Sequence, residues 1–204
     1  MEKLNSPFID SYIPKYSVNE LLEQLSKGKS LSYVFFWEAS KAELSIGWFS
    51  QFQYSPFTVD DYEYSFAEQY MMAQKALVFN DKEVYDKILL AKDPMEIKGL
   101  GRQVKNFSET EWKKIRYNIV LNGNYYKFMQ NKEMMQILLS TEDKILVEAS
   151  PYDKIWGIGI DESNKKITDP NNWQGQNLFG FALMEVRDKI NKIMEYNDTA
   201  LNKR

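Results

Sequence analysis

The 204-residue chain contains neither histidine nor cysteine. These absences exclude Ser-His-Asp and Cys-His catalytic groups, disulfides, and zinc sites built from histidine and cysteine. Any acid–base or nucleophilic chemistry must therefore use Asp, Glu, Lys, Tyr or Ser. A bound metal would be a hard cation held by oxygen atoms, but the sequence has no DxDxDG-type loop. We expect no metal and no cofactor.

Glycine and proline are also scarce, with 9 and 6 residues, whereas 44% of the chain is hydrophobic and 15% aromatic. This composition indicates a globular chain with little disorder. No apolar run is long enough to span a bilayer, and the N-terminus lacks the order of a signal peptide. We therefore expect a cytoplasmic protein with no membrane partner. The net charge of −3 comes from interspersed charges, which argues against a broad basic face for nucleic acid.

The hydrophobic pattern predicts mainly helices, with a few short strands. We expect a helical N-terminal arm at 1–29, one domain at 30–196 and a frayed polar tail at 197–204. A hairpin with an Asp60-Asp61 turn is predicted at 57–64. Helices are predicted at 17–27, 65–75, 81–92, 93–101, from 108 past 120, 131–139 and 178–194, and further strands at 31–37, 44–49 and 144–149.

The tract SFAEQYMMAQK, which begins at Ser65, places several functional groups on one short helix. Glu68 and Lys75 are seven positions apart, so they return to nearly the same face roughly 10 Å apart along the axis. Met71 and Met72 lie between them, an arrangement typical of a pocket wall. The alternative is structural, because Ser65 and Glu68 also form a capping box, in which the glutamate only closes the start of the helix.

A second tract, 146–160, carries a strand that ends in a proline-containing turn with Asp153 and Trp156. Loops at strand ends often carry active-site side chains. Asp153 is equally explained as an Asx turn or a helix cap, and Trp156 as a core residue. Gly157 and Gly159 alone are not a dinucleotide signature, since no helix with a third glycine follows.

Several short blocks follow one another between Tyr33 and Ile190. They are FSQF (49–52), SPF (55–57), SxxExY with QK (65–75), GR (101–102), Trp112, KFxQN (127–131), LVEASPxD (146–153), WGxG (156–159), GxNLFG (175–180), LM (183–184) and VR (186–187). In these blocks the chain resembles the NADAR domain, the YbiA-like N-glycosidase family. Two departures are visible: Gln69 stands where the family commonly has histidine, and Asp60-Asp61 replaces the usual Asp-Gly turn.

The resemblance implies an α+β fold, a mainly helical single domain around a small β-sheet. It also implies hydrolysis of the N-glycosidic bond between a base and a phosphorylated ribose, as in riboflavin-pathway intermediates. The expected partner is thus a small ribosylated nucleotide. One alternative is removal of ADP-ribose from guanine in nucleic acid. An alternative of another class is a non-catalytic module that binds ADP-ribose or a nucleotide. The oligomeric state stays open.

An oxocarbenium-like state needs a carboxylate, a stacking surface and phosphate donors. We expect Glu68 to stabilise the ribosyl cation or activate water, Asp153 to orient ribose or water, and Trp156 to stack on the base. For Lys75 three roles stay open: a partner for a carboxylate, a phosphate donor, or an amine nucleophile. Arg102 binds phosphate or forms a surface salt bridge. The predicted substrate-binding set is Trp48, Gln53, Phe57, Tyr70, Gln74, Arg102, Trp156, Gly157, Gly159 and Asn177.

Overall fold

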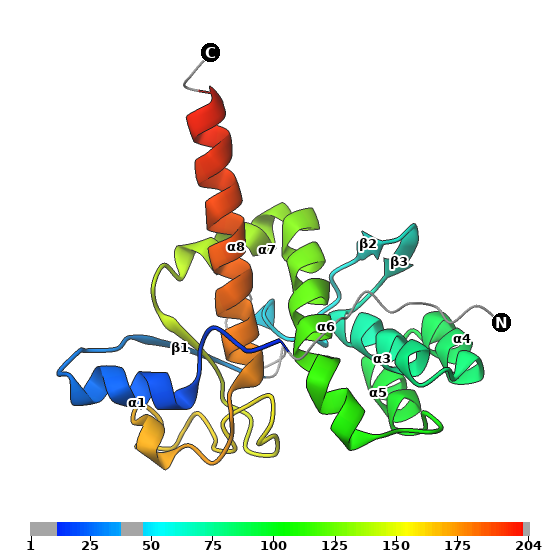
Figure 1. Cartoon of the computed structure of the whole chain (residues 1–204), viewed down its shortest axis with the longest axis horizontal. Coiled ribbons are helices and arrows are strands. Elements are labelled where there is room, and N and C mark those ends of the chain that lie inside the picture. Colours follow the sequence, from blue (N-terminus) through cyan, green and yellow to red (C-terminus); the bar gives the residue numbers. More distant parts are fainter. Residues whose placement is uncertain (1–11, 38–46, 202–204) are drawn as a thin grey trace. The chain divides into compact units, whose positions relative to one another are not determined.

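The computed structural model describes residues 12–37 and 47–201 (Figure 1). The α+β class predicted from the sequence is confirmed, and the described strands form two two-stranded sheets. The described residues divide into two compact units, the first with 12–13 and 54–127 and the second with 14–37, 47–53 and 128–201. The elements are α1 (Val18–Ser26), β1 (Tyr33–Phe36), β2 (Phe57–Val59), β3 (Tyr62–Tyr64), α3 (Ala67–Val78), α4 (Lys82–Leu90), α5 (Pro94–Arg102), α6 (Glu109–Gln130), α7 (Lys132–Ser140), β4 (Ile145–Glu148), the 3-10 helix η1 (Pro170–Asn172) and α8 (Leu178–Leu201).

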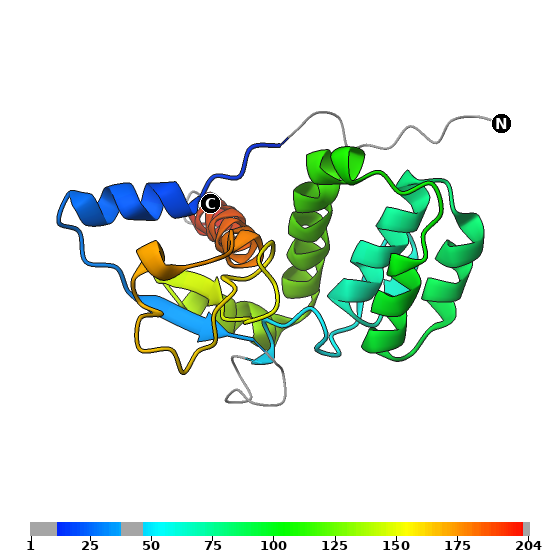
Figure 2. The same ribbon diagram turned by 90° about the horizontal axis from the view of Figure 1, so that it is seen from below.

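In the first unit, helices α3, α4 and α5 pack against one another (Figure 2). Gly101 allows the close approach of α5 to α3, because a Cβ atom at this position would overlap the Met72 side chain. Helices α4 and α5 begin at aspartate caps that the sequence shows. Asp93, for example, accepts a hydrogen bond from the Glu96 backbone N–H at 2.8 Å, as its position before Pro94 predicted.

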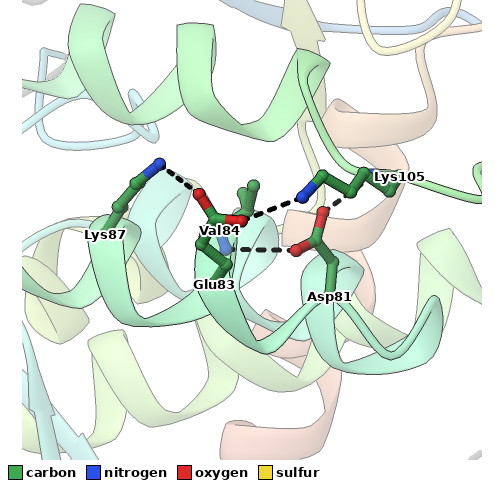
Figure 3. Close-up of polar contacts among 5 residues, drawn as sticks. All are labelled: Asp81, Glu83, Val84, Lys87 and Lys105. Atoms are coloured by element: carbon green, nitrogen blue, oxygen red, sulfur yellow. Dashed lines mark hydrogen bonds and ion pairs between the residues drawn. The ribbon is translucent and has the colours of Figure 1, made fainter.

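A polar network fixes the start of α4 to the connection between α5 and α6 (Figure 3). The Asp81 carboxylate accepts hydrogen bonds from the backbone N–H groups of Val84 (3.2 Å) and Lys105 (2.8 Å). Glu83 pairs with Lys87 at 2.7 Å and with the Lys105 ammonium at 2.9 Å. The hydrogen bond from the Lys105 amide is the main reason why the pKa of Asp81 is lowered.

The β2–β3 hairpin forms as predicted, with Phe57 paired to Tyr64. Asp60 and Asp61 both have left-handed backbone conformations, with φ of 49° and 62°. Two consecutive residues of this kind form the type I′ turn, whose twist matches that of the flanking strands. The second aspartate thus adopts the conformation for which an Asp-Gly turn uses glycine.

In the second unit, β1 pairs with β4 in parallel, with Tyr33 opposite Ile145 and Phe36 opposite Glu148. A partner strand for β1 was predicted at 44–49, of which 44–46 lie outside the described residues. The described part, 47–49, is helical or turn, so the prediction is wrong there. Parallel pairing joins distant segments through a long connection, and local patterns do not reveal it. Helix α8 packs on β4.

The N-terminal segment that precedes α1 is attached to α8. The Lys15 backbone N–H donates to Glu185 Oε1 at 2.7 Å, and the Tyr16 hydroxyl donates to Asp188 Oδ2 at 2.8 Å. Helix α8 extends to Leu201, so most of the tail that was predicted to be frayed is helical. Among the described residues, no helix is long and apolar enough to cross a membrane.

Candidate functional site

The start of α3 tests the interpretation of Glu68 as part of a capping box. The helix begins at Ala67, and its N-cap residue, Phe66, makes no side-chain capping bond. The predicted Ser65–Glu68 capping box is therefore wrong. The neighbouring Gln69 acts there instead, because its Oε1 atom accepts a hydrogen bond from the Ser65 backbone N–H at 2.8 Å. Glu68 remains a carboxylate with only 5% of its surface exposed.

Gln69 has a structural role at this position. Besides its bond to Ser65, its Nε2 atom donates to the Ile88 carbonyl oxygen at 3.0 Å, near the end of α4. The side chain is almost fully buried, and a buried amide needs such partners. It therefore fixes the start of α3 to the end of α4.

Lys75 lies near the C-terminal end of α3, against the residues around the end of α5. Its Nζ atom donates a hydrogen bond to the Gly101 carbonyl oxygen at 2.8 Å. It also lies over two aromatic rings, 4.2 Å from the centroid of Phe107 and 5.8 Å from that of Trp112. Aromatic faces attract cations. The surroundings of Lys75 therefore suit an ammonium group.

The charges around Lys75 act on its pKa in opposite directions. Burial lowers the pKa and is the largest effect, whereas the carboxylates of Glu109 and Glu68 raise it. The guanidinium of Arg102 adds to the lowering. Glu68, Lys75 and Arg102 are thus near enough to interact electrostatically, and Arg102 is exposed at the end of α5.

Three other residues that were predicted to bind substrate lie in the first unit: Phe57, Tyr70 and Gln74. They belong to a packed cluster of polar and aromatic side chains. Tyr70 is buried, and its hydroxyl oxygen accepts a hydrogen bond from Asn122 at 2.8 Å. Its ring lies 6.1 Å from that of Phe57 and 5.2 Å from that of Tyr64. Gln74 hydrogen-bonds the Tyr64 side chain. The buried positions of Phe57 and Tyr70 indicate packing roles, so their part in substrate binding stays a prediction.

In the second unit, Asp153 forms the turn that follows β4. Its Oδ1 atom accepts hydrogen bonds from the backbone N–H groups of Ile155 (2.8 Å) and Trp156 (2.7 Å). This is the Asx-turn alternative that the sequence left open. Trp156 is half-buried. Trp48 and Gln53 are half-buried as well, in a turn segment of the same unit.

Gly157, Gly159 and Asn177 shape the backbone around the end of β4. A Cβ atom on Gly157 would lie 2.8 Å from the Glu148 carbonyl oxygen, and Gly159 has a φ of +69°. Asn177 is fully buried; its Oδ1 accepts from the Glu148 N–H at 3.0 Å, and its Nδ2 donates to the Leu146 carbonyl at 2.9 Å. Its amide thereby pairs with the β4 backbone much as a neighbouring strand would.

Lys127 belongs to the KFxQN block, and no function was predicted for it from the sequence. It is fully buried, and burial lowers its pKa to about 7. Lys127 lies seven residues after Val120 and three after Asn124, and the structure shows that both of these residues are buried on α6. That spacing places the three side chains on one face of the helix. A lysine on a buried helical face is a candidate for unusual titration.

The predicted residues therefore lie in two groups. The first unit brings Glu68, Lys75 and Arg102 together, and the second contains Asp153, Trp156 and the residues around β4. Among the residues that the structure describes, no cluster of three or more acidic side chains could hold a metal ion.

Comparisons with known proteins agree with this fold. The solution structure of YbiA from Escherichia coli matches with a TM-score of 0.66 at 24% identity, over 93% of this chain and 95% of that one. An N-glycosidase of Acanthamoeba polyphaga mimivirus is 44% identical over 77% of this chain and 95% of its own length. An N-glycosidase of Nostoc punctiforme is 29% identical, over 72% and 88%.

The architecture is thus that of YbiA, an α+β fold. The family model described as the NADAR domain matches residues 35–191. The chain belongs to the NADAR domain family, and the resemblance seen in the sequence is confirmed.

Proposed function

We propose that this chain is an N-glycosidase that hydrolyses the bond between a base and a phosphorylated ribose, of the kind found in early riboflavin-pathway intermediates. The enzyme class, a hydrolase of N-glycosidic bonds, is that of its named relatives. The observation that supports a catalytic role for Glu68 is its burial on α3 at a helix start where Gln69, and not Glu68, makes the capping contact.

Glu68 acts on the ribosyl carbon. As the C–N bond breaks, the base leaves with the electron pair of that bond, and positive charge develops on the ribose. A carboxylate stabilises this charge. It also accepts a proton from water, whose oxygen forms the new bond to the ribosyl carbon. That proton then passes to the nitrogen of the departing base, which returns Glu68 to its ionised form.

In the proposed mechanism Lys75 supplies a positive charge and does not act as a nucleophile. A lysine that donates to the Gly101 carbonyl and lies over the Phe107 ring presents its protonated form. Arg102 is a second cation nearby, and two neighbouring cations favour an anion between them. We therefore assign Lys75 and Arg102 to the substrate phosphate.

Asp153 and Trp156 contribute through the turn that they form. Asp153 Oδ1 accepts a hydrogen bond from the Trp156 backbone N–H at 2.7 Å, so the carboxylate fixes the backbone from which the indole extends. We assign Trp156 to stacking on the base and Asp153 to holding the backbone of Trp156 in place.

Gln69 stands where the family commonly has histidine, and its role here is structural. Its hydrogen bonds to backbone groups favour a structural role for the histidine that the family commonly has there.

A covalent route through a lysine imine is the alternative mechanism. It requires a neutral amine, and the lowered pKa makes Lys127 a better source than Lys75 near neutral pH. Incubation with substrate and borohydride, followed by peptide mapping, separates the possibilities. We expect no ribose adduct on Lys75. An adduct on Lys75 would overturn its assignment as a charge, and an adduct on Lys127 would establish the covalent route.

The substrate is tested with a panel of a ribosylated aminopyrimidine phosphate and a guanine oligonucleotide that carries ADP-ribose. Chromatography detects the released base or ADP-ribose, and titration calorimetry detects binding. The proposal predicts cleavage of the aminopyrimidine compound. Cleavage of the oligonucleotide alone would assign the chain to the removal of ADP-ribose. Binding without product over a long incubation would identify a binding module.

A further inference from the structure

The connection between α5 and α6 places an aromatic ring against Lys75. No function was predicted from the sequence for Phe107, which lies in this connection with its ring centroid 4.2 Å from the Lys75 Nζ atom. The same ammonium donates a hydrogen bond to the Gly101 carbonyl oxygen at 2.8 Å. All three residues belong to the first unit. One short segment of the chain, from the end of α5 to the start of α6, thus supplies both the carbonyl and the ring.

The ring of Phe107 is supported although it is partly exposed. Phe107 has 42% of its surface exposed, whereas Phe79, which directly follows α3, has only 8%. The two rings make an edge contact, with centroids 5.2 Å apart and planes at 65°. This arrangement is a favourable geometry for an aromatic pair. Phe79 therefore supports the ring that lies against Lys75.

The backbone that carries Phe107 is anchored two residues earlier. The Lys105 backbone N–H donates to Asp81 Oδ2 at 2.8 Å, and the Lys105 ammonium pairs with Glu83 at 2.9 Å (Figure 3). Asn106, between Lys105 and Phe107, has a left-handed backbone conformation with a φ of 56°. Asparagine adopts this conformation more readily than most residues. The polar network at the start of α4 therefore fixes the backbone from which the Phe107 side chain extends.

The charged groups that act on Lys75 come from three helices. Burial, the largest effect, lowers the pKa of Lys75, and the Arg102 guanidinium at the end of α5 adds to the lowering. The carboxylates of Glu109 on α6 and Glu68 on α3 raise the pKa. The aromatic face of Phe107 favours the charged ammonium and so acts in the same direction as the carboxylates. The ring also restricts a flexible side chain to one position.

We propose that Phe107 is a positioning residue for the reaction, which holds the Lys75 ammonium in the place where it receives the substrate phosphate. The inference rests on the proposed function and adds to it a residue that touches no reacting atom. The contacts of Lys105 with Asp81 and Glu83 serve the same purpose, because they fix the segment that carries the ring. Phe107 therefore affects the binding of the phosphate and not the breaking of the C–N bond.

The first test follows Lys75 in the protein without substrate. Phe107→Leu removes the ring but stays apolar, and Phe107→Tyr keeps the ring; both should fold, because Phe107 is partly exposed. NMR titration of protein labelled at the lysine ε carbons gives the pKa of Lys75, whose signal is assigned by its loss in Lys75→Arg. We expect Phe107→Leu to lower this pKa by about half a pH unit. Phe107→Tyr should leave it unchanged, as should the control Tyr196→Leu, since Tyr196 is exposed on α8.

The second test measures KM and kcat for the ribosylated aminopyrimidine phosphate over a range of pH. A lower pKa means that the Lys75 ammonium is lost at a lower pH. The KM of Phe107→Leu should therefore exceed that of wild type increasingly as the pH rises, reaching about 3-fold in the alkaline range, while kcat stays unchanged. Phe107→Tyr and Tyr196→Leu should follow the wild-type profile.

Asp81→Asn tests the anchor of the segment. Its side-chain oxygen can still accept from the Val84 N–H, whereas the amide nitrogen that replaces Oδ2 cannot accept from the Lys105 N–H. We expect a decrease in the pKa of Lys75 that is smaller than the decrease in Phe107→Leu. An unchanged pKa in Asp81→Asn would overturn the role of the anchor.

Two results would overturn the role of Phe107 itself. One is a Lys75 titration that Phe107→Leu leaves unchanged, and the other is a rise in KM that is equal for Phe107→Leu and Phe107→Tyr. If wild type cleaves no ribosylated substrate, the proposed function fails. The NMR titration, which needs no substrate, then still decides whether Phe107 positions Lys75.

Discussion

Replacing Lys127 by methionine should stabilise the protein by an amount that depends on pH. Burial lowers the pKa of Lys127 from 10.5 to about 7. The difference, 10.5 minus 7, is about 3.5 pH units. At about 1.4 kcal/mol per unit, this corresponds to a penalty on the order of 5 kcal/mol for holding the ammonium in the interior. Methionine has a similar length and no charge, so the variant avoids the penalty.

The sign of the pH dependence follows from proton binding. Below about pH 7, Lys127 is protonated in both the folded and the unfolded state, so the folded state bears the whole penalty. Between about pH 7 and 10.5 the folded state is neutral while the unfolded chain still binds the proton. The free energy of unfolding of the wild type therefore rises with pH in this window. The advantage of Lys127→Met should be largest at pH 6 and about 2 to 3 kcal/mol smaller at pH 9.

Urea denaturation at pH 6, 7, 8 and 9, followed by circular dichroism, measures this difference. Lys113→Met is the matched control, because Lys113 lies on the same helix with 61% of its side chain exposed. The control should change stability little, and equally at every pH. A difference between Lys127→Met and wild type that does not vary with pH would refute the reasoning. So would a variant that is less stable than wild type at pH 6.

Three further substitutions test other parts of the account. Gln69→Leu removes hydrogen bonds between α3 and α4, so it should lower the free energy of unfolding by about 2 kcal/mol. Urea denaturation measures this change, and an unchanged midpoint would contradict the structural role of Gln69. Asn177→Leu leaves two β4 backbone groups without their amide partner and places leucine at a φ of 53°. It should cost about 3 kcal/mol or more, and hydrogen exchange at β4 should rise; unchanged exchange would refute this. Gly123→Ala places a Cβ atom 2.5 Å from the Tyr70 ring and should cost about 1 to 3 kcal/mol; a thermal midpoint equal to wild type would show that the ring moves freely.

Signals that act within a few residues made much of the fold predictable. Ser17 and Asp93 cap helices whose N–H groups lie three positions along the chain, and the Asp60-Asp61 turn lies within its hairpin. The partner of β1 was not predictable in this way. Its register joins residues as far apart as Tyr33 and Ile145, and no local pattern encodes that choice.

The candidate site could be predicted only in part, because local patterns do not encode contacts between distant segments. Helical spacing predicted that Glu68 and Lys75 share one face of α3, and the carboxylate of Glu68 raises the pKa of Lys75. Whether Glu68 caps the helix depended on the competing side chain of Gln69, which is fixed by contacts with α4. The role of Asn177 required knowledge of which backbone groups of β4 face it. Lys127 was visible in the sequence but its burial is a property of the packed helix.

The most direct test of the central claim is the activity of Glu68→Gln at saturating and limiting substrate, with its folding midpoint measured in parallel. Glu96→Gln, an exposed residue on α5, serves as the control. The account predicts that Glu68→Gln folds with a midpoint close to that of wild type and loses about 10²- to 10⁴-fold in kcat/KM, while Glu96→Gln keeps full activity. A folded Glu68→Gln variant that turns over substrate at the wild-type rate would contradict the assignment of the reaction to this carboxylate.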